Sequence, residues 1–463
     1  MTADGPSQGP PFDPGFRPVV VAWREHLARS RASGEAPLRL AVEREDGLVS
    51  VFDTVVPRED ARPEMTYRVV ERLVKFLLWS RGGWRLHVLG PAAVGRRLKA
   101  DYSESGPRAF DVRTMSRVYG RPFEVVLHSP ATFPEAREAV RFPGGHLDGF
   151  RVGFDLGASD YKVAAVIDGA PVWSEEIPWS PGTEADPDYH YRLIQEGLKK
   201  AAARLPRVDA IGGSSAGIII RNRVRIASLF RSVPDDVFER EVKDIFVRLA
   251  AEWGVPFEVI NDGEVTALAG MLSLGETGVL GVAMGSSEAA GFLDLDGHIP
   301  GWLDELAFVP VDLSPDAAVD EWSGDRGVGA NYFSQQAVDR LAPAAGLAFP
   351  PEMKLPERLK EAQSLMDRGD ARAAGIFASI GVYLGFTVPW YETFYRFKNL
   401  LVLGRVMSGP GGTVIVDKAT EVLEAEFPEV AARVRVHLLD ETSRRVGQAV
   451  AAASLPEIKG ARP

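Results

Sequence analysis

With 463 residues, 45% of them hydrophobic and 25% charged, the chain has the composition of a globular protein of roughly two to four domains. A formal net charge of −11 argues against a nucleic-acid binder, because no surplus of basic side chains is available to neutralise phosphates. The absence of cysteine excludes disulfides, thiolate metal sites and a cysteine nucleophile. The first residues, MTADGPSQGPPFDPG, lack the features of a signal peptide, and no stretch approaches the roughly 20 apolar residues of a membrane span. We therefore expect a cytoplasmic protein with no membrane or nucleic-acid partner.

Strand-like and helix-like segments alternate from the beginning of the chain. Residues 38–43 and 48–56 read as a strand pair around a turn at Asp46-Gly47. Residues 65–79 carry apolar side chains at helical spacing, and 84–90 and 121–127 read as two further strands. The glycine-rich stretch that follows, 141–149, is typical of a linker.

A second alternating series begins at Phe150. It comprises strands at 150–157, 162–168, 171–177, 207–213, 257–262, 279–285, 289–297 and 399–406, with helices at 191–204 and about 235–253. Strands and helices alternate without a long run of either, so the fold class is α/β. We expect a flexible tail at 1–17, an extra α/β domain at 18–149, two lobes at 150–272 and 273–440, and a C-terminal helix and tail at 441–463.

A possible internal repeat links the two series. GRPFEVV at 120–126 nearly matches GVPFEVI at 254–260, and comparable strand segments precede each in the same order. Two interpretations stay open: a degenerate duplicate of the following domain, or convergent strand composition. In a duplicate the chemistry would be lost, because His128 stands where Asp262 stands.

Four segments combine small residues with groups that could bind phosphate or act on a hydroxyl. DLGASDYK at 155–162 joins an acidic residue to a tight turn whose backbone could face phosphate. VINDGEVTALAG at 259–270 places Asn-Asp at the end of a buried strand, where ligands bind in α/β folds, although Asp there can also cap a helix. MGSSEAAGFLDLDG at 284–297 and LVLGRVMSGPGG at 401–412 are strands with small-residue turns. A plain hairpin turn is the alternative for the first and third segments.

The order of these segments resembles that of actin-like sugar kinases, and the motifs resemble the ROK family in particular. The resemblance covers roughly 150–453, about two thirds of the chain. It implies a two-lobed, actin-like (ribonuclease H-like) sugar-kinase fold with an additional N-terminal α/β domain, with ATP and Mg²⁺ as cofactors and a homodimer as an oligomeric state to consider.

Roles follow from the resemblance position by position. Asp262 resembles the general base for the attacking sugar hydroxyl, while Asn261 and Glu305 resemble sugar-binding residues. Asp155 resembles the residue that holds Mg²⁺. The expected phosphate and nucleotide contacts are Asp155, Gly157, Ser159, Gly285, Ser286 and Gly404.

Several positions depart from the family pattern. Phe308 replaces the His that usually follows the sugar-binding Glu. The stretch EWSGDRGVGANYF has no cysteine or histidine, so we expect no zinc and a loop held by packing around Trp322 and Tyr332. The resemblance makes 155–162 the first phosphate loop, 284–297 the second phosphate loop and 401–412 the adenosine loop. Ser287, Ala289 and Ala290 replace glycine in the second phosphate loop, where their side chains would crowd phosphate. These departures favour altered sugar specificity or the loss of turnover.

Two other functions fit part of the sequence. GSSAG at 213–217 matches the G-x-S-x-G elbow of hydrolases, but the β-branched run after it favours a strand over the required helix. A sugar- or nucleotide-sensing pseudokinase without turnover is the stronger rival to an active kinase. No helix-turn-helix is evident near the N-terminus, which disfavours a repressor.

Overall fold

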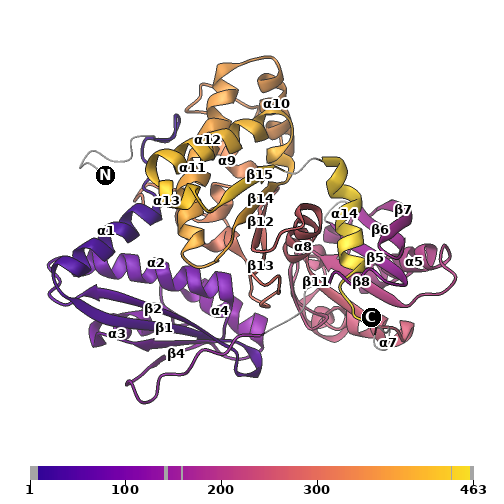
Figure 1. The fold of residues 1–463 in the computed structure, drawn as a ribbon, viewed down its shortest axis with the longest axis horizontal. Coiled ribbons are helices and arrows are strands. Elements are labelled where there is room, and N and C mark those ends of the chain that lie inside the picture. Colours follow the sequence, from indigo (N-terminus) through magenta and orange to yellow (C-terminus); the bar gives the residue numbers. More distant parts are fainter. Residues whose placement is uncertain (1–8, 140–143, 158–159, 439–440, 459–463) are drawn as a thin grey trace. The chain divides into compact units, whose positions relative to one another are not determined.

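The computed structural model describes residues 9–139, 144–157, 160–438 and 441–458. The chain divides into two compact units. Unit 1 comprises 1–140, 282–289 and 300–438, and unit 2 comprises 141–281, 290–299 and 439–463. This grouping differs from the sequence-based segments, since 18–140 falls in unit 1 with most of the expected C-lobe, and the C-terminal helix falls in unit 2. Figure 1 shows the helices and strands along the chain.

Unit 2 is built on a five-stranded sheet with the order β11-β8-β5-β6-β7. β5, β6 and β7 form antiparallel hairpins, whereas β8 and β11 extend the sheet in parallel to β5. Parallel neighbours need a crossover, and the helices α5 and α7 precede β8 and β11 respectively. The elements are β5 (Phe150–Leu156), β6 (Asp160–Ile167), β7 (Ala170–Pro178), α5 (Pro187–Ala202), β8 (Ala210–Ser215), β9 (Ile218–Ile220), β10 (Arg223–Ile226), α6 (Asp235–Val237), α7 (Ile245–Trp253), β11 (Phe257–Asn261), α8 (Asp262–Leu274) and α14 (Glu441–Ala453).

Two glycines let α14 lie directly on this sheet. A Cβ atom at Gly153 of β5 or Gly212 of β8 would overlap the carbonyl oxygen of Ala449 or Ala452 in the helix. Glycine is therefore required at positions 153 and 212 because any side chain there would collide with the helix backbone. The predicted C-terminal helix is confirmed, and it belongs to the core of unit 2.

A further four-stranded sheet has the order β13-β12-β14-β15. β14, β15 and the helices α9 to α13 belong to unit 1, whereas β12 and β13 are divided between the two units, with 282–289 in unit 1. The central helix of unit 1, α11 (Ala371–Glu392), has a mean hydropathy of 1.4 over its most apolar window and is long and apolar enough, by these measures alone, to cross a membrane. The expectation that no segment reaches this threshold was therefore wrong, but 83% of that window is buried inside the protein. The elements are β12 (Val279–Met284), β13 (Glu288–Leu293), α9 (Gln335–Leu341), α10 (Leu355–Asp367), β14 (Asn399–Leu403), α12 (Pro410–Glu426), α13 (Pro428–Ala431) and β15 (Arg435–Leu438).

The N-terminal region of unit 1 forms a second four-stranded sheet with the order β2-β1-β3-β4. The predicted hairpin is confirmed, with Asp46 and Gly47 at positive φ in its turn. The elements are α1 (Val19–Ala32), β1 (Glu35–Glu43), β2 (Val49–Pro57), α2 (Pro63–Arg81), β3 (Arg85–Leu89), α3 (Ala92–Asp101), α4 (Ala109–Tyr119) and β4 (Glu124–Leu127).

Strand direction contradicts the internal repeat. The supposed copies have the same order of neighbours, but β1 and β3 are antiparallel whereas β5 and β8 are parallel. A duplicated sheet would keep both order and direction. The similarity between 120–126 and 254–260 is therefore a matter of strand composition.

The N-terminal region shares its core with the rest of unit 1. Phe76 of α2 stacks on Phe394 at 3.9 Å between ring centroids and meets Trp390 of α11 edge-on at 5.2 Å. The end of the expected tail is also docked, because Phe16 is 2% exposed and the backbone N–H of Arg17 donates to Asp312. Residues 1–8 lie outside the described residues, but 9–17 are an ordered part of unit 1.

Candidate functional site

The first group of predicted site residues lies at the end of β5 in unit 2. Asp155 is 6% exposed, and its carboxylate accepts a hydrogen bond from the hydroxyl of Ser214 on the neighbouring strand β8. Lys162 of β6 places its ammonium 3.7 Å from the other carboxylate oxygen. Parallel pairing of β5 with β8 and antiparallel pairing with β6 bring these three side chains to one place.

The second group lies where β11 turns into α8. Asn261 caps the helix: its side-chain oxygen accepts from the N–H of Gly263 at 2.7 Å, and its amide donates to the carbonyl of Gly217 at 2.8 Å. The capping role is thus taken by Asn261, which leaves Asp262 as the first residue of the helix. A Cβ at Gly263 would overlap the carbonyl oxygen of Ala290, so this glycine lets the start of α8 lie against the β13 backbone.

The pKa of Asp262 is strongly perturbed. Desolvation, followed by repulsion from the Asp155 carboxylate, raises its pKa from 3.8 to about 6. Its side chain nevertheless stays partly accessible to solvent. An accessible carboxyl with a pKa near neutrality is suited to accept a proton from a bound hydroxyl.

The remaining residues of the first phosphate loop are only partly described. The carbonyl of Gly157 accepts a hydrogen bond from the indole of Trp179 at 2.8 Å. Ser159 lies outside the described residues, so its predicted phosphate contact stays a prediction.

Unit 1 brings two other predicted segments together. Gly285 and Ser286 form the turn between β12 and β13, and Ser286 is exposed. The carbonyl of Gly285 accepts from the N–H of Gln335 at 2.9 Å. Gly404, at the end of β14, has φ 104° and lies so close to Met284 that a Cβ would overlap the Met284 carbonyl. The expected second phosphate loop and the expected adenosine loop are therefore neighbours.

The Gly404→Ala variant is expected to be destabilised by about 2–4 kcal/mol, because a side chain there meets both an unfavourable φ and the Met284 backbone. Urea denaturation would measure the loss. Gly346→Ala is the matched control, since Gly346 also has a positive φ of 72° but has nothing within 4 Å of the added Cβ. Equal losses of unfolding free energy in the two variants would show that the close approach of Gly404 to Met284 does not contribute to the destabilisation.

Glu305 is held by the end of α2. The backbone N–H groups of Leu303 and Asp304 donate to the carbonyl of Ser80, and that of Glu305 donates to the carbonyl of Trp79, at 3.0–3.1 Å. Carbonyls in the last turn of a helix have no partner within the helix, so they are available for such bonds. No pattern in the sequence indicates that α2 positions this segment.

Phe308, which stands where the family usually has His, packs on the same helix. Its ring lies 4.2 Å from that of Trp79 between centroids. The indole of Trp79 in turn donates to Asp111. The substitution thus couples the candidate sugar segment to α2 by aromatic packing.

Two buried carboxyls of unit 1 were missed. Glu288 begins β13, accepts from the hydroxyl of Tyr391 at 3.0 Å, and has a pKa raised by burial to about 8. Asp304 adjoins Glu305, accepts from Tyr395 at 2.8 Å, and has a pKa raised by burial to about 7. Glu288 was visible in the sequence as an acidic residue among the small residues of the second phosphate loop, whereas the burial of Asp304 depends on long-range packing.

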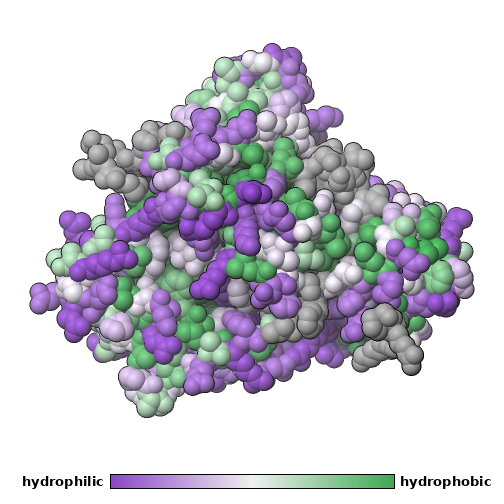
Figure 2. Space-filling view, viewed as in Figure 1, coloured by the Kyte–Doolittle hydropathy of each residue, from purple (hydrophilic) through white to green (hydrophobic). Residues whose placement is uncertain are grey.

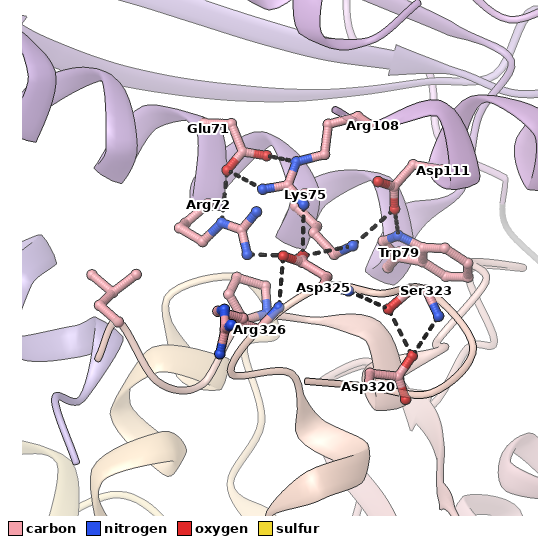
Figure 3. A network of polar contacts seen from close by, with 12 residues as sticks. Glu71, Arg72, Lys75, Trp79, Arg108, Asp111, Asp320, Ser323, Asp325 and Arg326 are labelled. Atoms are coloured by element: carbon pink, nitrogen blue, oxygen red, sulfur yellow. Dashed lines mark hydrogen bonds and ion pairs between the residues drawn. The ribbon is translucent and has the colours of Figure 1, made fainter. Parts of the chain in front are cut away.

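Ion pairs hold the cysteine-free stretch 321–333 in place. Packing around Trp322 and Tyr332 was predicted to do so, but only one of these two aromatic residues is buried. Tyr332 is fully buried as expected, but Trp322 is 63% exposed, so that part of the prediction was wrong. Asp325 instead forms ion pairs of 2.8–2.9 Å with Arg72, Lys75 and Arg108 (Figure 3). These residues anchor the loop to α2 and to the segment before α4.

The structure contradicts the hydrolase alternative, in which Ser215 would be the nucleophile. Ser215 is fully buried, and the chain continues through Gly217 into β9 rather than into a helix. A nucleophile elbow requires an exposed hydroxyl between a strand and a helix.

Comparison with known proteins identifies the fold. No protein-family model matches the sequence, and no curated protein matches it. A crystal structure of a ROK family transcriptional regulator, a homologue of the Escherichia coli MLC protein, is 18% identical and aligns with a TM-score of 0.54 over 67% of this chain and 79% of that one. A ROK hexokinase from Thermus thermophilus (19% identity, TM-score 0.49, 66% and 98% covered) and a ROK glucokinase from Streptomyces griseus (18%, 0.49, 66% and 99%) are also similar. The mixed α/β chain therefore has the actin-like fold of the ROK family.

Proposed function

We propose that the protein is an ATP-dependent kinase that phosphorylates a sugar hydroxyl, of a hexose or hexosamine type, with Asp262 as the general base. The observation that carries the proposal is the state of Asp262: a partly accessible carboxyl with a pKa near 6 at the end of a parallel strand. A carboxyl with this pKa is ionised at neutral pH and still basic enough to share a proton in a transition state.

The chemical step needs few groups. The sugar oxygen attacks the γ-phosphorus of ATP while the γ-phosphorus–oxygen bond to ADP breaks, and the hydroxyl proton passes to the Asp262 carboxylate. Asn261 and Glu305 would hydrogen-bond the sugar and fix the direction of attack. In this scheme Asp262 begins each turnover ionised, so kcat/KM falls as the pH drops through about 6.

Asp155 is the residue suited to hold Mg²⁺. Its carboxylate offers the hard oxygen that Mg²⁺ prefers, and its repulsion on Asp262 shows an excess of negative charge that a cation would relieve. Such an ion supplies charge neutralisation of the transferred phosphoryl group. Lys162, 3.7 Å from Asp155, adds a positive charge beside the same group.

The nucleotide contacts complete the proposal. Gly285 and Ser286 would hold the ATP phosphates, Gly157 and Ser159 the transferred phosphate, and Gly404 the adenosine. The proximity of Gly404 to the β12–β13 turn supports their use by one ligand. Zinc has no place in the proposal, because the chain has no cysteine and its corresponding loop is anchored by Asp325.

A coupled ATP-turnover assay with Mg²⁺ against hexoses, hexosamines and polyols tests the proposal. We expect sugar-dependent ADP release, and in Glu305→Gln a KM for the sugar raised by about tenfold or more, since a hydrogen bond to a charged group contributes about 1.5–3 kcal/mol. Glu352→Gln, at an exposed position of unit 1, is the control and should leave KM unchanged. An unchanged KM in Glu305→Gln would remove Glu305 from the sugar site.

A sensing pseudokinase is the second candidate, and Glu288 favours it. A buried carboxyl directly after the Gly285–Ser287 turn repels a bound polyphosphate once it ionises, which with a pKa of about 8 happens mainly above neutral pH. Thermal stabilisation by a sugar without ADP release at any pH would support this candidate over the kinase.

A further inference from the structure

A cavity of about 380 Å³ lies within unit 1, between α2, the segment before α4, and the loop 312–326. Four arginines line it: Arg68, Arg72, Arg108 and Arg326. None of them was assigned a role above in binding sugar or nucleotide. Four carboxyl residues, Glu71, Asp111, Asp312 and Asp325, line the cavity as well, so what it can bind depends on which of these charges are already paired.

The inner wall of the cavity is electrically balanced. Arg72 and Arg108 pair with Glu71 and Asp325, and Lys75 behind them pairs with Asp325 and Asp111 (Figure 3). Three cations thus meet three carboxylates. Repulsion between Asp325 and Glu71 is part of this network, while the cations hold the pKa of Asp325 below its ordinary value of 3.8.

The outer wall is not balanced. Arg68 and Arg326 are exposed, and neither has a carboxylate partner among the described residues. The guanidinium of each donates a hydrogen bond to a backbone carbonyl: Arg68 to that of Leu313 at 2.5 Å and Arg326 to that of Ala317 at 3.0 Å. A guanidinium carries five N–H donors, so each retains donors for a ligand.

Asp312, the remaining acidic residue of the cavity lining, does not form an ion pair with Arg68 or Arg326. Asp312 accepts from the backbone N–H groups of Arg17 and Ser314 and from the hydroxyl of Tyr332. Its carboxylate is therefore already bound by neutral donors on the side of Tyr332. Two guanidinium groups at the mouth of the cavity remain available to an anion.

We propose that this cavity binds a phosphate group, free or as the monoester of a small metabolite, through Arg68 and Arg326. The planar fork of a guanidinium matches the oxygens of a phosphate, and two arginines can neutralise its two negative charges. The paired Arg72 and Arg108 form the positive half of the inner wall behind it. The cavity volume exceeds that of the phosphate alone, which leaves room for a small esterified group. The proposal does not depend on kinase activity.

Figure 2 shows hydrophilic and hydrophobic residues interspersed over the face that it draws.

Calorimetric titration of the full chain with inorganic phosphate and with glycerol phosphate, at constant ionic strength, tests the site. We expect binding of at least one of the two, and a loss of affinity of about tenfold or more in both Arg68→Gln and Arg326→Gln, because each removes charged hydrogen bonds to phosphate. Arg96→Gln, an exposed arginine of α3 outside the cavity, is the control and should bind as the unaltered chain does. Tighter binding of glycerol phosphate than of phosphate would identify a phosphorylated metabolite as the natural ligand, and the reverse would identify free phosphate.

Three outcomes would overturn the proposal. The first is that neither anion binds. The second is that both arginine variants bind phosphate as tightly as Arg96→Gln does, which would place the phosphate elsewhere, such as in the candidate nucleotide loops. The third is that all three variants lose affinity alike, which would indicate a general ionic effect. Circular dichroism spectra and melting temperatures of the ligand-free variants are measured alongside. We expect both to match those of the unaltered chain, because neither Arg68 nor Arg326 has a carboxylate partner among the described residues.

Discussion

Replacing Asp262 with Asn is expected to abolish sugar-dependent turnover and, at neutral pH, to make the protein more stable. The rate should fall by about 10²–10⁴-fold, because an amide cannot accept the proton of the attacking hydroxyl. The folded-state pKa of about 6 lies above the ordinary 3.8, so at pH 8 the ionised carboxylate weighs against the folded state. Removing it should increase the free energy of unfolding by about 1–2 kcal/mol, discounted for the partial exposure of the side chain.

The pH dependence of the gain in stability shows whether it comes from the titration of the Asp262 carboxyl. The gain in stability should be largest above pH 6 and should shrink as the pH falls from 6 to 3.8, below which Asp262 is mostly protonated in both the folded and the unfolded state. Urea denaturation at several pH values, with the turnover assay beside it, measures both quantities. Asp188→Asn, at an exposed position in the first turn of α5, is the control and should change neither by much. A variant that loses turnover and also loses stability would indicate a structural role for Asp262, and a variant with full turnover would place the base elsewhere.

The sequence sufficed for those features that depend on neighbours along the chain. Periodicity and turn residues predicted the hairpin around Asp46-Gly47, a helix at 65–79 and a strand at 257–262. The structure contains all three, with the helix at Pro63–Arg81 and the strand at Phe257–Asn261. The sequence also contained a hint that Asn261, and not Asp262, caps the helix, since Asn caps helices as well as Asp does. The structure shows that Asn261 caps α8.

Features set by distant contacts were not accessible. Strand direction in the supposed repeat depends on how β3 returns to β1, which no local pattern records. The expected helix at about 235–253 is interrupted, with a π-helical turn at Phe238–Val242, and β15 at Arg435–Leu438 was not predicted at all. A four-residue strand such as β15 is defined by its pairing with β14 and has too few residues to show a period.

The same distinction applies to the candidate site. Asp155, Asp262 and Gly404 were predicted as site residues because each lies at the end of a recognisable strand or directly after it. The role of α2 in holding Leu303–Glu305 was missed, because backbone hydrogen bonds leave no mark on side-chain identity. For that reason 18–149, interpreted from sequence as an extra domain, is described better as part of the structure that positions Glu305.

Removing the carboxylate of Asp325 is expected to cost the largest stability of any single substitution in unit 1 considered above. In Asp325→Ala, Arg72, Lys75 and Arg108 lose their shared partner while two of them are almost fully buried. Leaving buried charges uncompensated typically costs about 3–5 kcal/mol. Urea denaturation monitored by tryptophan fluorescence would measure this loss in the free energy of unfolding.

Asp53→Ala is the matched control, because Asp53 also pairs with an arginine, at 2.7 Å from Arg39, but is 62% exposed. An exposed pair is worth about 0–1 kcal/mol, so the two losses should differ by several-fold. The pKa of Asp325 is lowered in the folded state, so its contribution is present above the ordinary value of 3.8 and is lost only as the pH falls below it. The difference between the two variants should therefore persist at pH 5. Equal losses would show that the arginines and Lys75 find other partners when Asp325 is removed, and that the loop 320–326 does not depend on this ionic anchor.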